Sequence, residues 1–133
     1  MADAWAPEQL DLIGRSDELE IASGRADGTL RRWTPIWVVA ADGQVYVRTW
    51  HRRTTGWFGD VAGSHRARIR VPGLEAAVSV EDVGFGPGDL RARVDAAYRD
   101  KYGRYGDGSV GQMVGDAAAA ATLRLTPEPD GQG

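Results

Sequence analysis

Cysteine is absent from the 133-residue sequence. Its absence excludes disulfide bonds, thiolate nucleophiles, cysteine zinc sites and iron–sulfur clusters, so redox chemistry would need a bound cofactor. Histidine is scarce, with only His51 and His65, and the carboxylates near them, Asp60 foremost, do not follow a metal-ligand spacing. We therefore expect no metal site.

Long apolar runs are also missing. No stretch approaches the roughly 18 consecutive apolar residues that would span a bilayer, and the beginning of the chain, MADAWAPEQLDL, is acidic where a signal peptide would be basic. We expect a cytoplasmic protein with no membrane partner. The composition, 42% apolar and 26% charged, is that of one globular domain, which we place at residues 1–127, followed by a disordered tail at 128–133.

Lysine is nearly absent, because Lys101 is the only lysine among 16 basic residues. The formal net charge is −3, yet residues 28–73 contain eight arginines against Asp42 and Asp60, a local balance of +6. Nucleic-acid-binding domains are usually basic throughout, because they contact many phosphates along a polymer. We therefore expect a small anionic ligand and no nucleic acid. The alternative is that these arginines are solvated and pair with acidic residues of the flanking segments.

The clearest local pattern is a hairpin over residues 34–50, TPIWVVAADGQVYVRTW. Two β-rich runs flank Asp42-Gly43, a pair suited to the positive φ angles of a tight turn. Alternation along the second strand places side chains on two faces, with Val45, Val47 and Thr49 on one and Tyr46, Arg48 and Trp50 on the other. We expect one face to be core and the other to be functional or solvated.

The rest of the chain predicts further antiparallel strands and a few helices. Strands are expected at residues 18–23 and 121–127, and a second hairpin at 66–83 turns at Pro72-Gly73. We expect two or three helices from the patterns at 6–14, 56–63, 89–103 and 109–120. Together these elements predict a mainly β (α+β) fold, an antiparallel barrel of five or six strands with peripheral helices over its openings.

Three arginines stand on one face of the first strand of the second hairpin, because Arg66, Arg68 and Arg70 alternate with apolar residues. Like charges at this spacing repel one another, which is tolerable at a solvated surface or where an anion lies between them.

The segments that could bind a ligand combine arginine, threonine and tryptophan. They are LRRWTP at residues 30–35, RTWHRRTTGW at 48–57 and SHRARIR at 64–70. Arginine binds phosphate or carboxylate through a planar set of donors, threonine hydroxyls bond to the same oxygens, and tryptophan packs against a ring. We therefore expect an aromatic ligand with an anionic group. We place Trp37 in the core, and Trp33 could contact a second copy of the chain.

The stretches RRWTPIWVV, VYVRT and GWFGDVAGSHRARIRV resemble the core of the split β-barrel flavin and deazaflavin proteins. This resemblance covers roughly residues 28–80. The whole chain, including DGTLR, AYRDKYG and TLRLTP, is similar to a family of short uncharacterised bacterial proteins that we place in the same superfamily. The resemblance implies an antiparallel split β-barrel, a homodimer, and FMN or a phosphorylated deazaflavin as cofactor.

The resemblance also implies roles for individual residues. Arg32 and Thr34 match a first phosphate-binding pair, and Arg48 and Thr49 match a second pair on the neighbouring strand. Trp57 matches the residue that opens the short helix. The full set of candidate cofactor-binding residues is Arg32, Thr34, Arg48, Thr49, Trp50, Arg53 and Trp57.

Two functions remain open at this point. In the first, the protein binds a flavin-type cofactor and transfers hydride to a small organic substrate, with the cofactor supplying the redox chemistry and His51 as a candidate proton donor. In the second, the same barrel is a binding module without redox chemistry, or without any cofactor, and its arginines hold a small anionic metabolite. A fold alone does not separate these functions.

Overall fold

A computed structural model describes residues 5–24, 29–30, 32–48, 65–84, 86, 88–103 and 107–128. The helix expected at 56–63 and five candidate residues between positions 49 and 57 lie outside the described residues. Those five are Thr49, Trp50, His51, Arg53 and Trp57.

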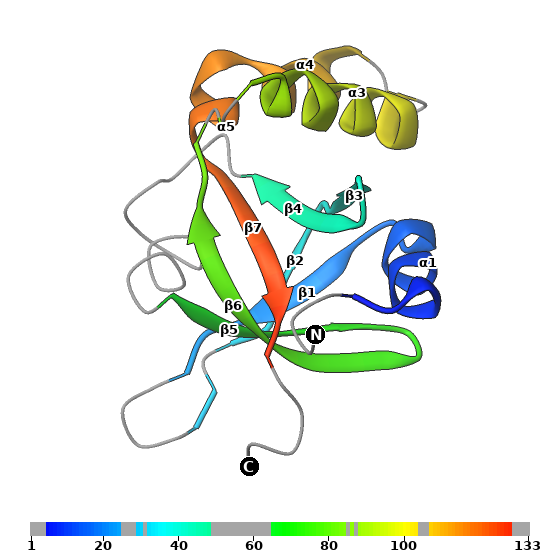
Figure 1. Cartoon of the computed structure of the whole chain (residues 1–133), viewed down its shortest axis with the longest axis vertical. Coiled ribbons are helices and arrows are strands. Elements are labelled where there is room, and N and C mark those ends of the chain that lie inside the picture. Colours follow the sequence, from blue (N-terminus) through cyan, green and yellow to red (C-terminus); the bar gives the residue numbers. More distant parts are fainter. Residues whose placement is uncertain are drawn as a thin grey trace.

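The described strands form one antiparallel sheet of seven strands, in the order β2-β1-β5-β6-β7-β4-β3. Their bounds are β1 (Leu19–Ala22), β2 (Thr34–Ile36), β3 (Val39–Ala41), β4 (Gln44–Arg48), β5 (Arg66–Val71), β6 (Leu74–Asp82) and β7 (Thr122–Pro127). The sheet curls into a half-barrel (Figure 1). The fold is therefore the predicted mainly β, antiparallel split β-barrel.

Both predicted hairpins are present. The turn between β3 and β4 has positive φ angles at Asp42 (53°) and Gly43 (78°), which the twist of a two-residue hairpin requires. The turn between β5 and β6 places Pro72 before Gly73, whose φ is 90°, as in a type II turn. These residues determine the register of four of the seven strands.

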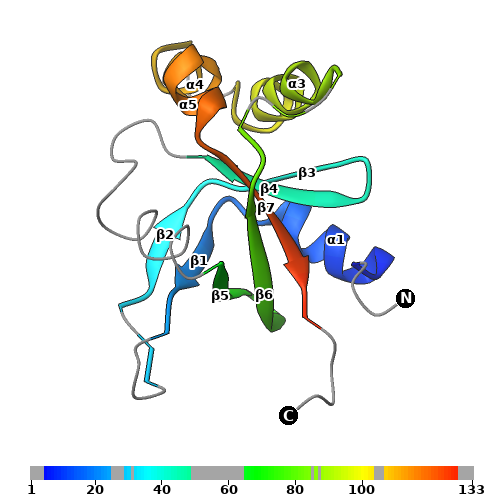
Figure 2. The same cartoon turned by 60° about the vertical axis from the view of Figure 1, so that its left-hand side comes forward.

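A short link joins the two edges of the sheet. β2 pairs with β1 at one edge and β3 pairs with β4 at the other, yet only Trp37 and Val38 separate β2 from β3 in the chain. Residues 34–41 therefore pass from one edge of the half-barrel to the other. In Figure 2 this segment runs from β2 to β3 across the middle of the molecule.

The helices form two groups, α1 (Pro7–Arg15) on one side of the half-barrel and α3 (Leu90–Tyr102), α4 (Asp107–Val114) and α5 (Asp116–Ala120) together above β3 and β4 (Figures 1 and 2). α3 buries the predicted stripe, Leu90, Val94, Tyr98 and Tyr102. The single helix expected at 109–120 is two helices, which are separated at Gly115. None of the described helices is long and apolar enough to cross a bilayer.

Two hydrophobic clusters lie on opposite faces of β4. Val45 and Val47 belong to the cluster inside the half-barrel, whereas Tyr46 belongs to the cluster under α3 and α4. Arg48, on the same face as Tyr46, is also buried, at 2% relative exposure. The expectation that one face of this strand would be functional or solvated is therefore wrong for the described residues, because the helices cover the second face.

The end of β7 continues into an ordered contact. The backbone amide of Glu128 donates a hydrogen bond to the carbonyl of Ala77, at 3.0 Å. Glu128, which we assigned to the tail, therefore extends the pairing of β7 with β6.

Candidate functional site

The three arginines of β5 each have a carboxylate partner. Arg66 binds Glu128 at 2.9 Å, Arg68 binds Glu75 at 3.2 Å and Arg70 binds Glu20 at 2.7 Å. The partners come from beyond β7, from β6 and from β1, so the acids of the flanking segments neutralise this row. An anion between these arginines is not needed to balance their charge, and such exposed pairs contribute little to stability.

Trp33 lies beside one of these pairs. The guanidinium of Arg70 is 4.1 Å from the centre of the Trp33 ring, close enough for a cation–π contact. Arg70 therefore contacts both Glu20 and Trp33. Trp37, which we placed in the core, is half-buried and stacks on Tyr102 with 4.0 Å between ring centres.

Arg48 is enclosed between β4 and the helices. Its Nε donates a hydrogen bond to the Thr122 hydroxyl at 2.9 Å. Its Nη1 donates to Asp95 Oδ1 at 2.6 Å and to the Met113 carbonyl at 2.9 Å. The guanidinium carbon also lies 5.4 Å from the centre of the Tyr98 ring. Arg48 thus joins β4, β7, α3 and α4 in the core, a position that the alternation pattern does not predict.

Asp95 is shared by two arginines. Its second oxygen lies 3.4 Å from Arg91 Nε, and Arg91 Nη1 lies 2.9 Å from Asp116. Side-chain exposure rises along this chain of ion pairs, from 0% at Arg48 to 13% at Asp95, 34% at Arg91 and 89% at Asp116. The ion pairs therefore connect a fully buried cation with the surface at α5.

Two side-chain atoms of the cluster around Arg48 have no hydrogen-bond partner among the described residues. They are Nη2 of Arg48 itself and the hydroxyl of Tyr98, and both are buried. Burial raises the pKa of Tyr98 well above its usual value, although the positive charge of Arg48 opposes this shift. Tyr98 is therefore a neutral phenol, and both atoms can donate hydrogen bonds.

Arg32 differs from the other described arginines of the cationic segment. Arg48, Arg66, Arg68 and Arg70 each pair with a carboxylate, whereas Arg32 is exposed and has no ion-pair partner within the described ranges. It precedes by two residues the half-buried Thr34, which begins β2 at one edge of the sheet. The structure does not bring either residue into contact with Arg48, whose side chain binds Thr122, Asp95 and the Met113 carbonyl instead.

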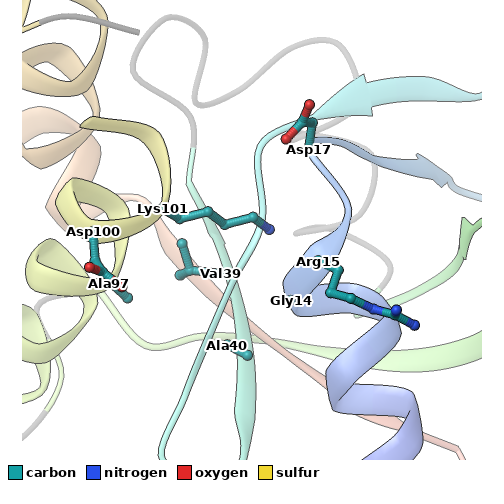
Figure 3. Close-up of a pocket in the computed structure, with 8 residues that line it drawn as sticks. All are labelled: Gly14, Arg15, Asp17, Val39, Ala40, Ala97, Asp100 and Lys101. Atoms are coloured by element: carbon teal, nitrogen blue, oxygen red, sulfur yellow. The ribbon is translucent and has the colours of Figure 1, made fainter. Parts of the chain in front are cut away.

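Two cavities occur among the described residues. The larger, of about 480 Å³, lies between the end of α1, β3 and α3, and its lining includes Arg15, Asp17, Asp100 and Lys101 (Figure 3). The other, of about 360 Å³, lies on the outer sheet face beside Arg66, Arg68 and Glu128. Neither cavity is lined by any of the seven candidate cofactor-binding residues, although Arg66 and Arg68 of the SHRARIR stretch line the smaller one. The described residues contain no group of three acids or histidines that could hold a metal ion.

Sequence reasoning did not identify Asp95, Tyr98 and Thr122 as neighbours of Arg48. Asp95 lies 47 residues from Arg48 and Thr122 lies 74 residues away. One local signal was available, because Arg91 and Asp95 are spaced i, i+4 on α3 and such residues are neighbours on a helix surface. The contact of Asp95 with Arg48 has no comparable local signal.

Solved structures show a similar fold. HutZ from Vibrio cholerae, described as a heme storage protein, has a TM-score of 0.63 and 16% identity, with 96% of this chain and 90% of that chain covered. The conserved hypothetical protein Rv2991 from Mycobacterium tuberculosis has a TM-score of 0.56 and 17% identity, with 98% and 84% covered. A NimC/NimA family protein from Clostridium acetobutylicum has a TM-score of 0.51 and 15% identity, with 90% and 78% covered.

At these identities the three structures support the fold alone. No curated protein matches the sequence significantly. Residues 9–125 match the family described as "Uncharacterized protein conserved in bacteria", DUF2255. Because the match spans most of the chain, this protein belongs to the DUF2255 family of bacterial proteins.

Proposed function

We propose that this protein binds a flat aromatic ligand with an anionic group, of the FMN or phosphorylated deazaflavin type. The proposal rests on the exposure and charge environment of Arg32. It is exposed and lacks a carboxylate partner within the described ranges, whereas the other described arginines of residues 28–73 are paired. Its donors are therefore available to an anion.

The chemistry of Arg32 and Thr34 suits a phosphate. A guanidinium presents parallel N–H donors that match two oxygens of a phosphate, and a threonine hydroxyl can donate to a third. Thr34 begins β2, an edge strand of the described sheet, so a ligand can approach from the side that none of the other described strands covers. We assign these two residues to the anionic group of the ligand.

The other candidate residues belong to the segment that follows β4. We assign Thr49 and Arg53 to the anionic group, and Trp50 and Trp57 to the faces of the ring. Arg48 has a different role in this proposal, because its charge is already balanced by Asp95 and its side chain is fully buried. Arg48 would hold the start of the segment against α3.

A bound flavin or deazaflavin would supply hydride transfer, which no side chain of this protein can perform. The chain would bind the cofactor, orient it and exclude water from one face, with His51 as the candidate proton donor. One similar structure is described as a heme storage protein, and heme, like FMN, is a flat ring system with anionic groups. This similarity supports a cofactor-binding half-barrel, and we further propose that the working unit is a homodimer.

The experiment begins with the visible spectrum of the protein as isolated. Calorimetric titrations with FMN, phosphorylated deazaflavin and riboflavin then follow. We expect tight binding of one phosphorylated cofactor and weak binding of riboflavin, because riboflavin lacks the anionic group. Absence of binding for all three, from folded protein, would contradict the flavin proposal. It would favour the second function, a binding module for a small anionic metabolite.

A further inference from the structure

The larger of the two described cavities is separate from the residues assigned to the flavin-type ligand, because none of the seven candidate cofactor-binding residues lines it. It has a volume of about 480 Å³ and lies between the end of α1, β3 and the last turn of α3 (Figure 3). One water molecule occupies about 30 Å³, and pockets that bind small molecules have volumes of roughly 300–1,000 Å³. The cavity is therefore large enough for a small organic molecule.

Part of the lining is small and apolar. The residues without a polar side chain are Gly14, Val39, Ala40 and Ala97. Val39 is buried and the other three are half-buried. These four residues, which we call the apolar wall, leave space against which the apolar part of a ligand can pack.

The fold does not explain the glycine in this wall. Gly14 lies inside α1, where glycine is less favourable than residues with a side chain, and its backbone is helical. A Cβ built on Gly14 would meet no atom within 4 Å. Neither a left-handed conformation nor crowding therefore requires glycine at this position. A residue without a side chain does, however, let a ligand approach the helix backbone closely.

The charged residues of the lining carry both signs. Arg15 ends α1 and Asp17 follows it, whereas Asp100 and Lys101 belong to α3. The pair of Arg15 with Asp11 is exposed and therefore weak, so Arg15 can also contact a ligand. A ligand with a single charge would meet a like charge in this lining as well as an opposite one. A ligand with an ammonium and a carboxylate group can place each beside an opposite charge.

Two residues of α3 are suited to the two groups of such a ligand. Lys101 Nζ donates hydrogen bonds to the carbonyls of Ile13 at 3.3 Å and of Val38 at 2.7 Å, so the side chain extends from α3 towards α1 (Figure 3). These bonds fix the position of its positive charge. Asp100 is exposed and forms no ion pair within the described ranges. Its carboxylate is therefore available to an ammonium group.

We infer that this cavity binds a small zwitterion with an apolar side chain, of the size of an amino acid such as leucine. The ammonium group of the ligand would pair with Asp100, and its carboxylate would lie towards Lys101 and Arg15. Its side chain would pack against the apolar wall. This inference does not depend on the proposed flavin site.

The test compares three probes of similar size by titration, with the amide chemical shifts of isotopically labelled protein as the readout. Leucine carries both charges, 4-methylpentanoate lacks the ammonium group and isopentylamine lacks the carboxylate. We expect saturable shifts with leucine that centre on the residues lining the cavity. The dissociation constants of the two single-charge probes should be higher by roughly tenfold or more, because each lacks one charge-assisted hydrogen bond.

Two variants test the assignment of residues. Asp100→Asn should fold, because Asp100 is exposed, and it should remove most of the preference for leucine over 4-methylpentanoate. Ala97→Leu places a larger side chain in the wall of the cavity and should abolish saturable binding. Ala92→Leu is the matched control, because Ala92 lies on the same helix but is exposed and is not among the described lining residues.

Four results would overturn the inference. The first is the absence of saturable shifts when leucine is added to the wild type. The second is equal binding of leucine and a single-charge probe, which would identify a site for a simple acid or amine. The third is an unchanged preference for leucine in Asp100→Asn. The fourth is equal affinity for leucine in the wild type and Ala97→Leu, which would place the binding outside this cavity.

Discussion

The hydroxyl of Tyr102 accepts a hydrogen bond from the backbone amide of Val38, at 3.0 Å. It also lies 2.7 Å from the carbonyl of Asp17, to which it can donate. The carbonyl of Val38 accepts from Lys101 Nζ at 2.7 Å. Val38 lies in the short link between β2, which pairs with β1, and β3, which pairs with β4. Side chains of α3 therefore bind backbone groups where the chain passes from one edge of the sheet to the other. The only lysine of the chain therefore has a structural role.

Tyr102→Phe should lower the free energy of unfolding by about 1–3 kcal/mol, because the buried amide of Val38 would lose its partner. Urea denaturation measures this change. Tyr98→Phe is the matched control on the same helix, since the hydroxyl of Tyr98 has no protein partner among the described residues. We expect Tyr98→Phe to be neutral or stabilising. A loss of stability in Tyr98→Phe as large as in Tyr102→Phe would contradict this assignment.

Asp95→Asn should destabilise the fold by about 3 kcal/mol or more, because it leaves the buried cation of Arg48 without a counter-charge. Asp116→Asn provides the control within the same chain of ion pairs. Asp116 is 89% exposed, so its replacement should change the free energy of unfolding by less than about 0.5 kcal/mol. Equal effects in the two variants, measured by chemical denaturation, would show that Arg48 does not need Asp95.

Arg32→Ala should weaken FMN binding roughly tenfold or more, because a charge-assisted hydrogen bond to phosphate is lost. Binding of riboflavin should change little. Arg99→Ala is the control, since Arg99 is also exposed and has no ion-pair partner within the described ranges, but lies on α3. Calorimetric titration of each variant with FMN and with riboflavin gives the two dissociation constants, whose ratio is compared with that of the wild type. Similar losses for FMN and riboflavin would exclude Arg32 from the phosphate role.

Gly86→Ala should be more destabilising than Gly88→Ala. Both glycines have a positive φ, 71° and 58°, so both substitutions add backbone strain of about 1 kcal/mol. A Cβ at Gly86 would also lie 2.8 Å from Leu90 Cβ and 2.9 Å from Leu90 Cγ, whereas a Cβ at Gly88 meets no atom within 4 Å. Overpacking should add a further cost of about 1–3 kcal/mol at Gly86. Equal midpoints of thermal unfolding would show that Leu90 moves aside freely.

The stability of the protein should fall steeply in alkaline solution because of Tyr98. Its pKa is raised in the folded state by burial, whereas in the unfolded chain it titrates near 10.0. The folded state therefore holds this proton more tightly, and stability is lost as pH rises above about 10, by up to about 1.4 kcal/mol per pH unit. Free energies of unfolding at about pH 9 and about pH 11 measure this loss. Tyr98→Phe should show a smaller loss; an equal loss would assign the effect to other groups.

The local sequence was sufficient to predict the elements whose conformation depends on residues that are close together in the chain. Asp42-Gly43 and Pro72-Gly73 determine the two hairpin turns, because few other pairs tolerate their φ angles. The stripe of Leu90, Val94, Tyr98 and Tyr102 determines α3 through its helical spacing. The break at Gly115, in contrast, was not expected, because the pattern of 109–120 also fits one weak helix.

The candidate site was less predictable, because charge balance depends on residues that are distant in the sequence. The eight arginines of residues 28–73 look alike in the sequence. In the structure, Glu20, Glu75, Glu128 and Asp95 neutralise four of them, and Arg32 remains unpaired within the described ranges. Only these ion pairs, which depend on the tertiary structure, distinguish a structural arginine from one that is available to a ligand.

The sequence by itself determined the turns, the amphipathic helix α3, the antiparallel fold class and the family, since these follow from local backbone preferences and from the whole pattern of residues. The tertiary structure decided that β2 and β3 lie at opposite edges of the sheet, that the helices cover the second face of β4, and that Arg48 is a buried partner of Asp95. The reason is physical: burial and ion pairing depend on which elements pack together, and alternation along one strand does not specify what covers each face.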